Sequence, residues 1–212
     1  LALIDEQDDV LRRDRKRLQR VIDERARAVV APEVSAQGDS ALVDGVVLQA
    51  LQDEPIGALL DVGTGAGHLL GVLGPYATRA VGVDISSDAL RLARTIVHGA
   101  GLSHCELQRG DMYDLPFDPS FDTAAVDRIL ARAERPIAAL AEVARTLRPG
   151  GRLVVIEDFD ALNAIGANPI AILRNWLQRA GFETTRIHPL DTESTHLLIA
   201  LARRVDLTTA AA

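Results

Sequence analysis

The segment 59–68 limits the possible fold of this chain more than any other part of the sequence. An apolar run ends on Asp61, and glycines at positions 63, 65 and 67 then alternate with small residues before a helical pattern begins. This order is typical of a buried parallel strand, a tight turn where a ligand approaches the backbone, and the first turn of a helix. The segment therefore predicts an α/β fold with a ligand site at the turn.

The spacing of the glycines separates two classes of cofactor. Dinucleotide-binding turns have glycine at the first, third and sixth positions, with a helix N-terminus facing the pyrophosphate. Here the fifth position is glycine and His68 occupies the sixth. Asp61 would also place negative charge beside phosphate oxygens. A phosphate-free cofactor with a cationic amino-acid end would instead be attracted to Asp61, and S-adenosylmethionine is such a cofactor.

A second predicted strand, over residues 79–84, also ends on an acid. Because the carboxyl ends of neighbouring parallel strands meet at one edge of a sheet, Asp84 is placed to accept the hydroxyls of a ribose. Its alternative role is to cap the helix that follows. Ile85 would then lie against the adenine face.

The remaining elements follow from apolar periodicity and from capping residues. Ser86 or Ser87 is expected to begin one helix, and Asn168 or Pro169 another, which Gly181 ends as its C-cap. The predicted strands are 105–112, 121–127, 147–157, 182–188 and 196–202, and the predicted helices are 40–51, 88–98 and 168–180.

Together, the glycine turn and the strands that follow it resemble the motifs of class I S-adenosylmethionine-dependent methyltransferases, of the type 11/25-like kind. The likeness includes the run Arg148-Pro149-Gly150-Gly151 before the fifth strand, and it covers roughly residues 56–201. It implies a Rossmann-like, doubly wound α/β fold whose seven-stranded sheet has helices on both faces. In that fold the last strand is antiparallel and lies between the fifth and the sixth.

The same resemblance implies the cofactor and its contacts. The cofactor would be S-adenosyl-L-methionine or its demethylated product, S-adenosyl-L-homocysteine. An acid at the end of the third strand would bind the adenine amino group, and the next residue would flank the ring. The residues predicted to bind the cofactor are Asp61, Gly63, Thr64, Gly65, Gly67, Asp84, Ile85, Asp111, Met112 and Asp127.

Catalytic residues are less clearly marked than the cofactor site. The protein must align the acceptor, exclude water and, for some acceptors, remove a proton. Asp127 and Asp158 follow predicted strands and are candidate bases, although each could be an ordinary strand-end or capping residue. No metal-ligand spacing is present, and the single cysteine, Cys105, is expected to be a small buried hydrophobe, so arsenite methylation is not expected.

The chain is expected to divide into four segments. These are a helix over 1–31 that acts as a linker or dimerisation element, a helical lid or lead-in over 32–55, the S-adenosylmethionine-binding domain over 56–205, and a flexible tail over 206–212. The basic run 12–27 is similar to the joining helix of ArsR-type transcription regulators that carry a fused methyltransferase-like domain. The apolar stripe of the first helix predicts burial against the domain or a second copy, and thus a possible homodimer.

Charge and hydropathy exclude several classes of function. The net charge is −7, and the basic residues near the N-terminus are interleaved with acids, which favours a solvated helix over direct nucleic-acid binding. No apolar stretch approaches the length of a membrane span, and the first residues are charged rather than signal-like. These features predict a cytoplasmic protein that does not interact with membranes.

Two functions remain open. The first, which we favour, is an S-adenosylmethionine-dependent methyltransferase acting on an unidentified small-molecule acceptor. The second is a non-catalytic domain of an ArsR-type regulator that senses the cofactor or its product, or that mediates dimerisation. The low aromatic content of 3% favours the second, because lids over small substrates usually contain aromatic residues. The cofactor motifs serve both functions equally.

Overall fold

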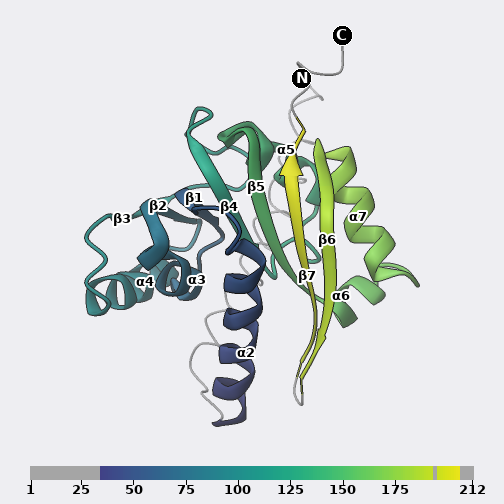
Figure 1. Ribbon diagram of the computed structural model, residues 1–212, viewed down its shortest axis with the longest axis horizontal. Helices are drawn as coiled ribbons and strands as arrows, with labels where there is room; N and C mark the ends of the chain where they lie inside the picture. Colours follow the sequence, from purple (N-terminus) through teal and green to yellow (C-terminus); the bar gives the residue numbers. More distant parts are fainter. Residues whose placement is uncertain (1–33, 193–194, 206–212) are drawn as a thin grey trace, which may run out of the picture. The chain divides into compact units, whose positions relative to one another are not determined.

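The computed structural model describes residues 34–192 and 195–205, with side chains from Ser40 onward (Figure 1). The residues that the structure describes belong to one compact unit. The predictions for the helix over 1–31, its basic run, dimerisation through it and the tail over 206–212 therefore lie outside the described residues.

One sheet of seven strands forms the centre of the described unit, in the order β3-β2-β1-β4-β5-β7-β6. Strands β1 to β5 are parallel to one another, whereas β7 is antiparallel to both β5 and β6. The predicted doubly wound fold is confirmed, including the insertion of the last strand between the fifth and the sixth. The strands are β1 Gly57–Val62, β2 Ala77–Asp84, β3 Cys105–Arg109, β4 Phe121–Asp127, β5 Leu147–Asp158, β6 Phe182–Asp191 and β7 His196–Arg204.

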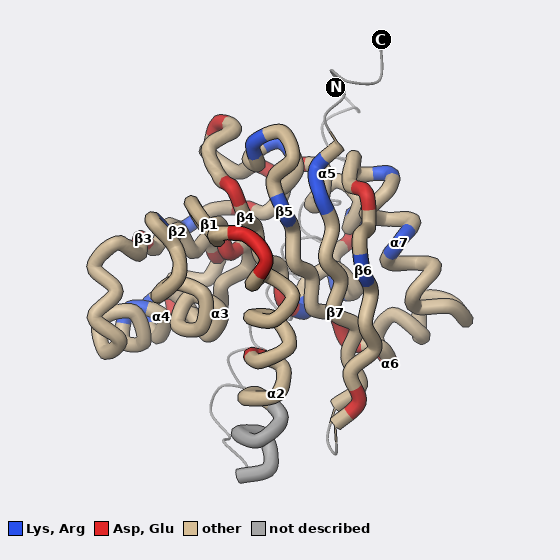
Figure 2. Tube along the Cα trace, in the orientation of Figure 1, with Lys and Arg blue, Asp and Glu red and all other residues tan. Residues whose placement is uncertain are grey.

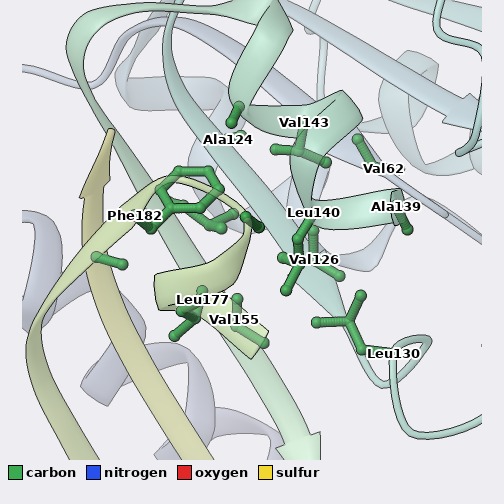
Figure 3. Packing of buried hydrophobic residues seen from close by; sticks show 14 of the residues in the cluster. Val62, Ala124, Val126, Leu130, Ala139, Leu140, Val143, Val155, Leu177 and Phe182 are labelled. Carbon is green, nitrogen blue, oxygen red and sulfur yellow. The ribbon is translucent and has the colours of Figure 1, made fainter. Parts of the chain in front are cut away.

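Helices cover both faces of the sheet, and each face has its own apolar core. Alternate strand residues such as Leu60 and Val126 pack against α5, α6 and α7, as the close-up of Val126, Leu140 and Leu177 shows (Figure 3). The intervening residues, such as Leu59, pack against α2, α3 and α4. The helices are α2 Val34–Leu51, α3 His68–Leu73, η1 Gly74–Tyr76, α4 Ser87–Gly99, α5 Pro136–Thr146, α6 Phe159–Asn163 and α7 Pro169–Arg179.

Three predicted boundaries are wrong by three residues or more, and one of them is the end of β6, which lies at Asp191 rather than at 188. The third strand ends at Arg109, so Asp111 lies in a turn where it forms an isolated bridge with Asp114. Gly110 follows the strand, its N–H donates to the Asp84 carbonyl, and a Cβ there would approach Val83 to 2.7 Å. Helix α2 begins at Val34 rather than near Ser40. The glycine at position 38 lies inside this helix, where glycine costs only about 1 kcal/mol relative to alanine.

Both predicted N-caps are confirmed. The Ser86 hydroxyl accepts from the Ala89 N–H at 3.2 Å, and the Asn168 side chain accepts from the Ala171 N–H at 3.0 Å. Gly181 follows the C-cap residue Ala180 and has a φ of 88°, the left-handed conformation that glycine adopts at helix ends.

Buried Arg152 of β5 holds the end of α2 against the sheet. Its guanidinium donates to the carbonyls of Leu51, Glu54 and Pro55, at 3.2, 3.2 and 2.7 Å, and to the Thr123 hydroxyl at 3.2 Å. Burial lowers the pKa of Arg152. Figure 2 marks the acidic residues that follow α2 in red, with basic positions on β5 and β7 in blue. The lead-in helix is thus fixed at its C-terminal end by one charged side chain.

A second arginine clamp holds the loop after β3 against α5. Arg145 donates to the carbonyls of Leu115 and Phe117 at 2.6 Å, and to both carboxylate oxygens of Glu142 at 3.0 and 2.6 Å. Glu142 also accepts from the Leu115 N–H at 2.9 Å. The hydrogen bond from Arg145 lowers the pKa of Glu142 against the opposing effect of burial.

We expect Glu142→Gln to reduce the free energy of unfolding by about 1–2 kcal/mol at pH 7, because it removes a charge-assisted pair. The pKa of Glu142 is lower in the folded state, so its contribution is present above the unfolded pKa and is lost as the pH falls through the folded one. Urea unfolding at several pH values should show the loss of stability below about pH 4.5 becoming shallower in the variant.

Glu183→Gln is the matched control, because Glu183 is exposed on β6. It should change neither the stability at pH 7 nor the acid dependence by more than about 0.5 kcal/mol. Equal acid dependence of the wild type and Glu142→Gln would contradict the assigned role of the clamp.

Candidate cofactor site

The glycine turn follows β1 directly and is held against the neighbouring strand. Gly63, Gly65 and Gly67 have φ values of 70°, 56° and 85°, in the left-handed region that side chains disfavour. The N–H groups of Gly63 and Thr64 donate to the Val83 carbonyl at 2.7 and 2.9 Å. The turn therefore lies across the carboxyl ends of β1 and β2, where parallel sheets bind ligands.

The glycines of the turn are required for different reasons. A Cβ on Gly67 would meet the Cα and Cβ atoms of Ala93 in α4 at 3.0 Å, so this glycine allows helix and turn to pack closely. A Cβ on Gly65 would have only the Gly63 carbonyl oxygen within 4 Å, at 3.9 Å. Gly65 thus borders open space, as expected where a ligand approaches the backbone.

Two buried carboxylates flank the turn. Asp61, at the end of β1, is 2% exposed and accepts a 2.6 Å hydrogen bond from the Thr64 hydroxyl. Asp84, at the end of β2, is 7% exposed and accepts from the N–H groups of Gly65 and Ser86, both at 2.8 Å. Each oxygen of the Asp84 carboxylate accepts one of these bonds and has a second lone pair, so Asp84 keeps acceptor capacity for a ligand.

The loop after β3 is joined to the same edge of the sheet. The N–H of Gly110 reaches the Asp84 carbonyl at 3.1 Å, and Arg109 donates to the Ile85 carbonyl at 3.2 Å. Asp111 is exposed and accepts from the Tyr113 N–H at 2.9 Å, while Met112 packs partly buried against the core. The structure therefore brings Ile85, Asp111 and Met112 into one region beside Asp84, and their contact with adenine stays a prediction.

Asp127 ends β4 and forms a two-pronged ion pair with its neighbour. Arg128 donates from Nε at 2.8 Å and from Nη2 at 3.0 Å to the two carboxylate oxygens. The hydrogen bond with Asp127 raises the pKa of Arg128. Among the described residues, Arg128 is the one non-glycine position with positive φ, at 51°. Such strain is common at functional sites, and a role for the end of β4 in the site stays a prediction.

Asp158 and Glu157 end β5 and organise the loops beside it. The Asp158 carboxylate accepts from the Ala161 N–H at 2.8 Å and caps α6, the capping role considered from the sequence. Glu157 is 1% exposed and accepts from the Leu130 N–H at 2.6 Å. Base catalysis by Asp127 or Asp158 stays a prediction, and both carboxylates already hold local structure.

Sequence reasoning missed a polar cluster between α2 and α3. His68 Nε2 lies 2.8 Å from the Asp44 carboxylate and 3.3 Å from the Ser40 hydroxyl. The side chains of His68 and Asp44 are 46% and 22% exposed. The position of His68 directly after the last glycine was the available signal, but its partners lie more than twenty residues earlier.

The chemistry of the site fits S-adenosylmethionine better than a dinucleotide. The buried acids can attract an ammonium group and accept ribose hydroxyls, whereas they would repel a pyrophosphate. The run from Asp61 to His68 contains no lysine or arginine that could neutralise phosphate. In the part of the chain that the structure describes, no cluster of His, Cys, Asp and Glu could hold a metal ion.

Comparisons with known proteins agree with this geometry. Residues 60–155 match the family described as a methyltransferase domain. An uncharacterized 37.1 kDa protein in transposon TN4556 of Streptomyces fradiae is 36% identical over 165 residues, covering 73% of this chain and 47% of that protein. The uncharacterized methyltransferase YcgJ of Bacillus subtilis is 27% identical over 128 residues, covering 60% and 49%. The chain spans about half the length of these curated relatives.

The fold is also found in solved structures. A SAM-dependent methyltransferase from Aquifex aeolicus superposes with a TM-score of 0.65 and 21% identity, covering 76% of this chain and 89% of that one. This likeness supports the fold, and the match over residues 60–155 supports the family. Residues 60–155 therefore match a methyltransferase domain, on a fold shared with S-adenosylmethionine-dependent methyltransferases, and this match and the site support S-adenosylmethionine as the cofactor.

Proposed function

We propose that this protein transfers the methyl group of S-adenosylmethionine to a small-molecule acceptor. The observation that carries the proposal is the pair of buried acids, Asp61 and Asp84, on either side of a glycine turn that borders open space at Gly65. This arrangement supports binding of a cationic nucleoside without phosphate.

The bound cofactor supplies an activated methyl group on a sulfonium, so the protein has little covalent chemistry to perform. We infer that Asp84 orients the ribose and that Asp61 faces the amino-acid end. Asp127, Arg128 and Glu157 would shape the acceptor side, because they lie at the ends of β4 and β5. Alignment and exclusion of water would then provide most of the rate enhancement.

The location of the protein, its oligomeric state and its possible fusion to a regulator are not tested by the site geometry. Within the described residues, none of the helices has the length and apolarity needed to cross a bilayer. A cytoplasmic location, a homodimer, and a place next to an ArsR-type DNA-reading domain remain predictions. The relatives and the solved structure named above are not described as regulators, so they give the sensor alternative no support.

Gly65→Ala is expected to weaken binding of S-adenosylhomocysteine at least tenfold, because the new methyl group enters the space at the turn. The positive φ should cost about 1–2 kcal/mol of stability. Gly101→Ala is the matched control, since Gly101 has a φ of 68° and open space around its Cβ, but lies after α4. Calorimetry should show lost affinity only for Gly65→Ala, and equal affinities of the two variants would contradict a ligand at Gly65.

Transfer itself is tested with methyl-labelled S-adenosylmethionine and a panel of phenols, carboxylic acids, amines and thiols. We expect labelled product with at least one of these classes, and less product with Gly65→Ala than with Gly101→Ala. Tight binding of S-adenosylhomocysteine with no labelling of any acceptor would contradict the enzymatic proposal and favour a binding domain.

A further inference from the structure

The first residue after β4 keeps a large side chain in a backbone conformation that favours glycine. Arg128 has a φ of 51°, in the left-handed region. The other described positions with positive φ are all glycine, at 57, 63, 65, 67, 101, 150 and 181. A residue with a side chain is less stable in this conformation than glycine is. Because glycine would relieve the strain, the presence of an arginine at this position needs its own explanation.

Backbone contacts to β5 hold the strained segment in place. The Arg128 N–H donates to the Ile156 carbonyl at 2.7 Å, and the Leu130 N–H donates to the buried Glu157 carboxylate at 2.6 Å. Leu130 is 1% exposed and packs in the same apolar core as Leu140 (Figure 3). The left-handed backbone is therefore fixed by its surroundings, and these contacts do not involve the Arg128 side chain.

The ion pair with Asp127 does not by itself account for the side chain. The Arg128 side chain is 50% exposed. Exposed ion pairs contribute about as much stability as a left-handed side chain costs, so the pair leaves no clear net gain. A strained residue that is kept without a gain in stability is expected where its side chain serves a ligand.

The guanidinium of Arg128 keeps one edge that Asp127 does not occupy. Nε and one hydrogen of Nη2 donate to the two oxygens of Asp127, at 2.8 and 3.0 Å. A guanidinium has five N–H donors in one plane, so both hydrogens of Nη1 and the second hydrogen of Nη2 remain. Within the described residues, no acceptor bonds to Nη1. The parallel donors of the Nη1–Nη2 edge match the two oxygens of a carboxylate.

This arginine lies at the same edge of the sheet as the glycine turn. Val126 pairs with Val62 in the parallel ladder of β4 and β1, so the chain leaves both strands at one edge. Arg132 and Arg135 are exposed in the same loop as Arg128. Because the cofactor is assigned to the glycine turn, an anion bound at the end of β4 would belong to the second substrate, the methyl acceptor.

The acids near Arg128 are engaged by donors of the protein. Asp127 accepts from Arg128 itself, and Glu157 and Asp158 each accept from a backbone N–H, at 2.6 and 2.8 Å. Glu134 is the other acid between β4 and α5. The hydrogen bond with Asp127, followed by the charges of Glu157 and Asp158, raises the pKa of Arg128. The neighbouring acids thus keep the guanidinium charged and leave its Nη1–Nη2 edge to a ligand.

We propose that the methyl acceptor carries a carboxylate and that the Nη1–Nη2 edge of Arg128 binds this group and determines specificity for it. The inference rests on the proposed function, since it names the class of acceptor for the same site. An acceptor that lacks the carboxylate would leave the guanidinium edge to water and would bind more weakly.

The test titrates the protein, saturated with S-adenosylhomocysteine, with benzoate, 4-hydroxybenzoate, indole-3-acetate and succinate, and with the neutral amide of each. We expect calorimetry to show at least one acid binding about tenfold more tightly than its amide. Arg128→Gly should abolish this preference, and Arg128→Lys should keep only part of it, because lysine retains the charge but not the paired donors. Arg148→Gly is the matched control, because it removes a similarly exposed arginine that pairs with Asp122, and it should keep the full preference.

Urea unfolding gives a second readout that does not depend on a ligand. Arg128→Gly should leave the unfolding midpoint unchanged or raise it, because glycine relieves the positive φ, whereas Arg148→Gly should lower it. A lower midpoint for Arg128→Gly would show that the ion pair explains the side chain and would overturn the inference. Equal binding of acids and amides, or a preference that survives Arg128→Gly, would also overturn it. If the wild type does not bind S-adenosylhomocysteine, the proposed function fails instead, so the two failures are distinguishable.

Discussion

Replacing Asp84 by asparagine is expected to weaken binding of S-adenosylhomocysteine about 100-fold. The substitution removes a charged acceptor for two ribose hydroxyls, and charge-assisted hydrogen bonds contribute about 1.5–3 kcal/mol each. It also turns an amide NH₂ toward the Gly65 or Ser86 N–H, both of which now donate to the carboxylate at 2.8 Å. Calorimetry at fixed pH and salt measures the change directly.

Asp122→Asn is the matched control for Asp84→Asn. Asp122 also accepts from a backbone N–H at 2.8 Å, that of Ala58, and it pairs with Arg148. However, Asp122 is the second residue of β4 and its partner Ala58 is the second residue of β1, so the contact lies at the opposite end of these strands from the glycine turn. The Asp122→Asn variant should be less stable than the wild type but should bind the cofactor with unchanged affinity. Similar losses of affinity in both variants would contradict the assigned role of Asp84.

Replacing Arg152 by methionine is expected to lower the free energy of unfolding by about 3 kcal/mol or more. The substitution keeps an apolar stem but leaves the buried Leu51 carbonyl and the part-buried Glu54 and Pro55 carbonyls without their donor, and an unsatisfied buried polar group costs about 1–3 kcal/mol. Urea unfolding followed by circular dichroism measures the loss. Because the end of α2 is released, S-adenosylhomocysteine affinity should fall as well.

Arg203→Met is the matched control, because Arg203 also places positive charge near Glu54, in the segment that follows α2. Arg203 pairs with Glu54 and donates to the Gly150 carbonyl at 3.1 Å, but its side chain is 41% exposed. An exposed pair of this kind contributes about 0–1 kcal/mol. Equal destabilisation by the two substitutions would show that the carbonyl contacts of Arg152 do not hold α2.

Much of the fold could be predicted because the signals are local. Apolar runs that end on Asp61, Asp84 and Asp127 predicted three parallel strands. The ends at Asp84 and Asp127 are correct, and the first strand continues one residue further, to Val62. Ser86 and Asn168 were recognisable caps, since a cap bonds to an N–H three residues ahead. The strand order, by contrast, came from the family resemblance and not from periodicity.

The missed features depend on contacts between distant residues. Arg152 reads as one polar residue in an apolar strand, and its partners Leu51 and Pro55 lie 101 and 97 positions away. The pairing of His68 with Asp44, 24 positions earlier, depends on how α2 packs on α3. Asp111 was placed on a strand because the apolar pattern does not mark the end of β3 at Arg109, and the bridge of Asp111 with Asp114 forms only in the folded turn.

The central claim is that Asp61, Asp84 and the glycine turn select a phosphate-free cationic nucleoside. Calorimetry of the unmodified protein with S-adenosylmethionine, S-adenosylhomocysteine and NAD tests this most directly. We predict that the first two bind at one site per chain and that NAD shows no binding at the same concentrations. Binding of NAD that S-adenosylmethionine does not displace, or no heat with either sulfur nucleoside, would contradict the account.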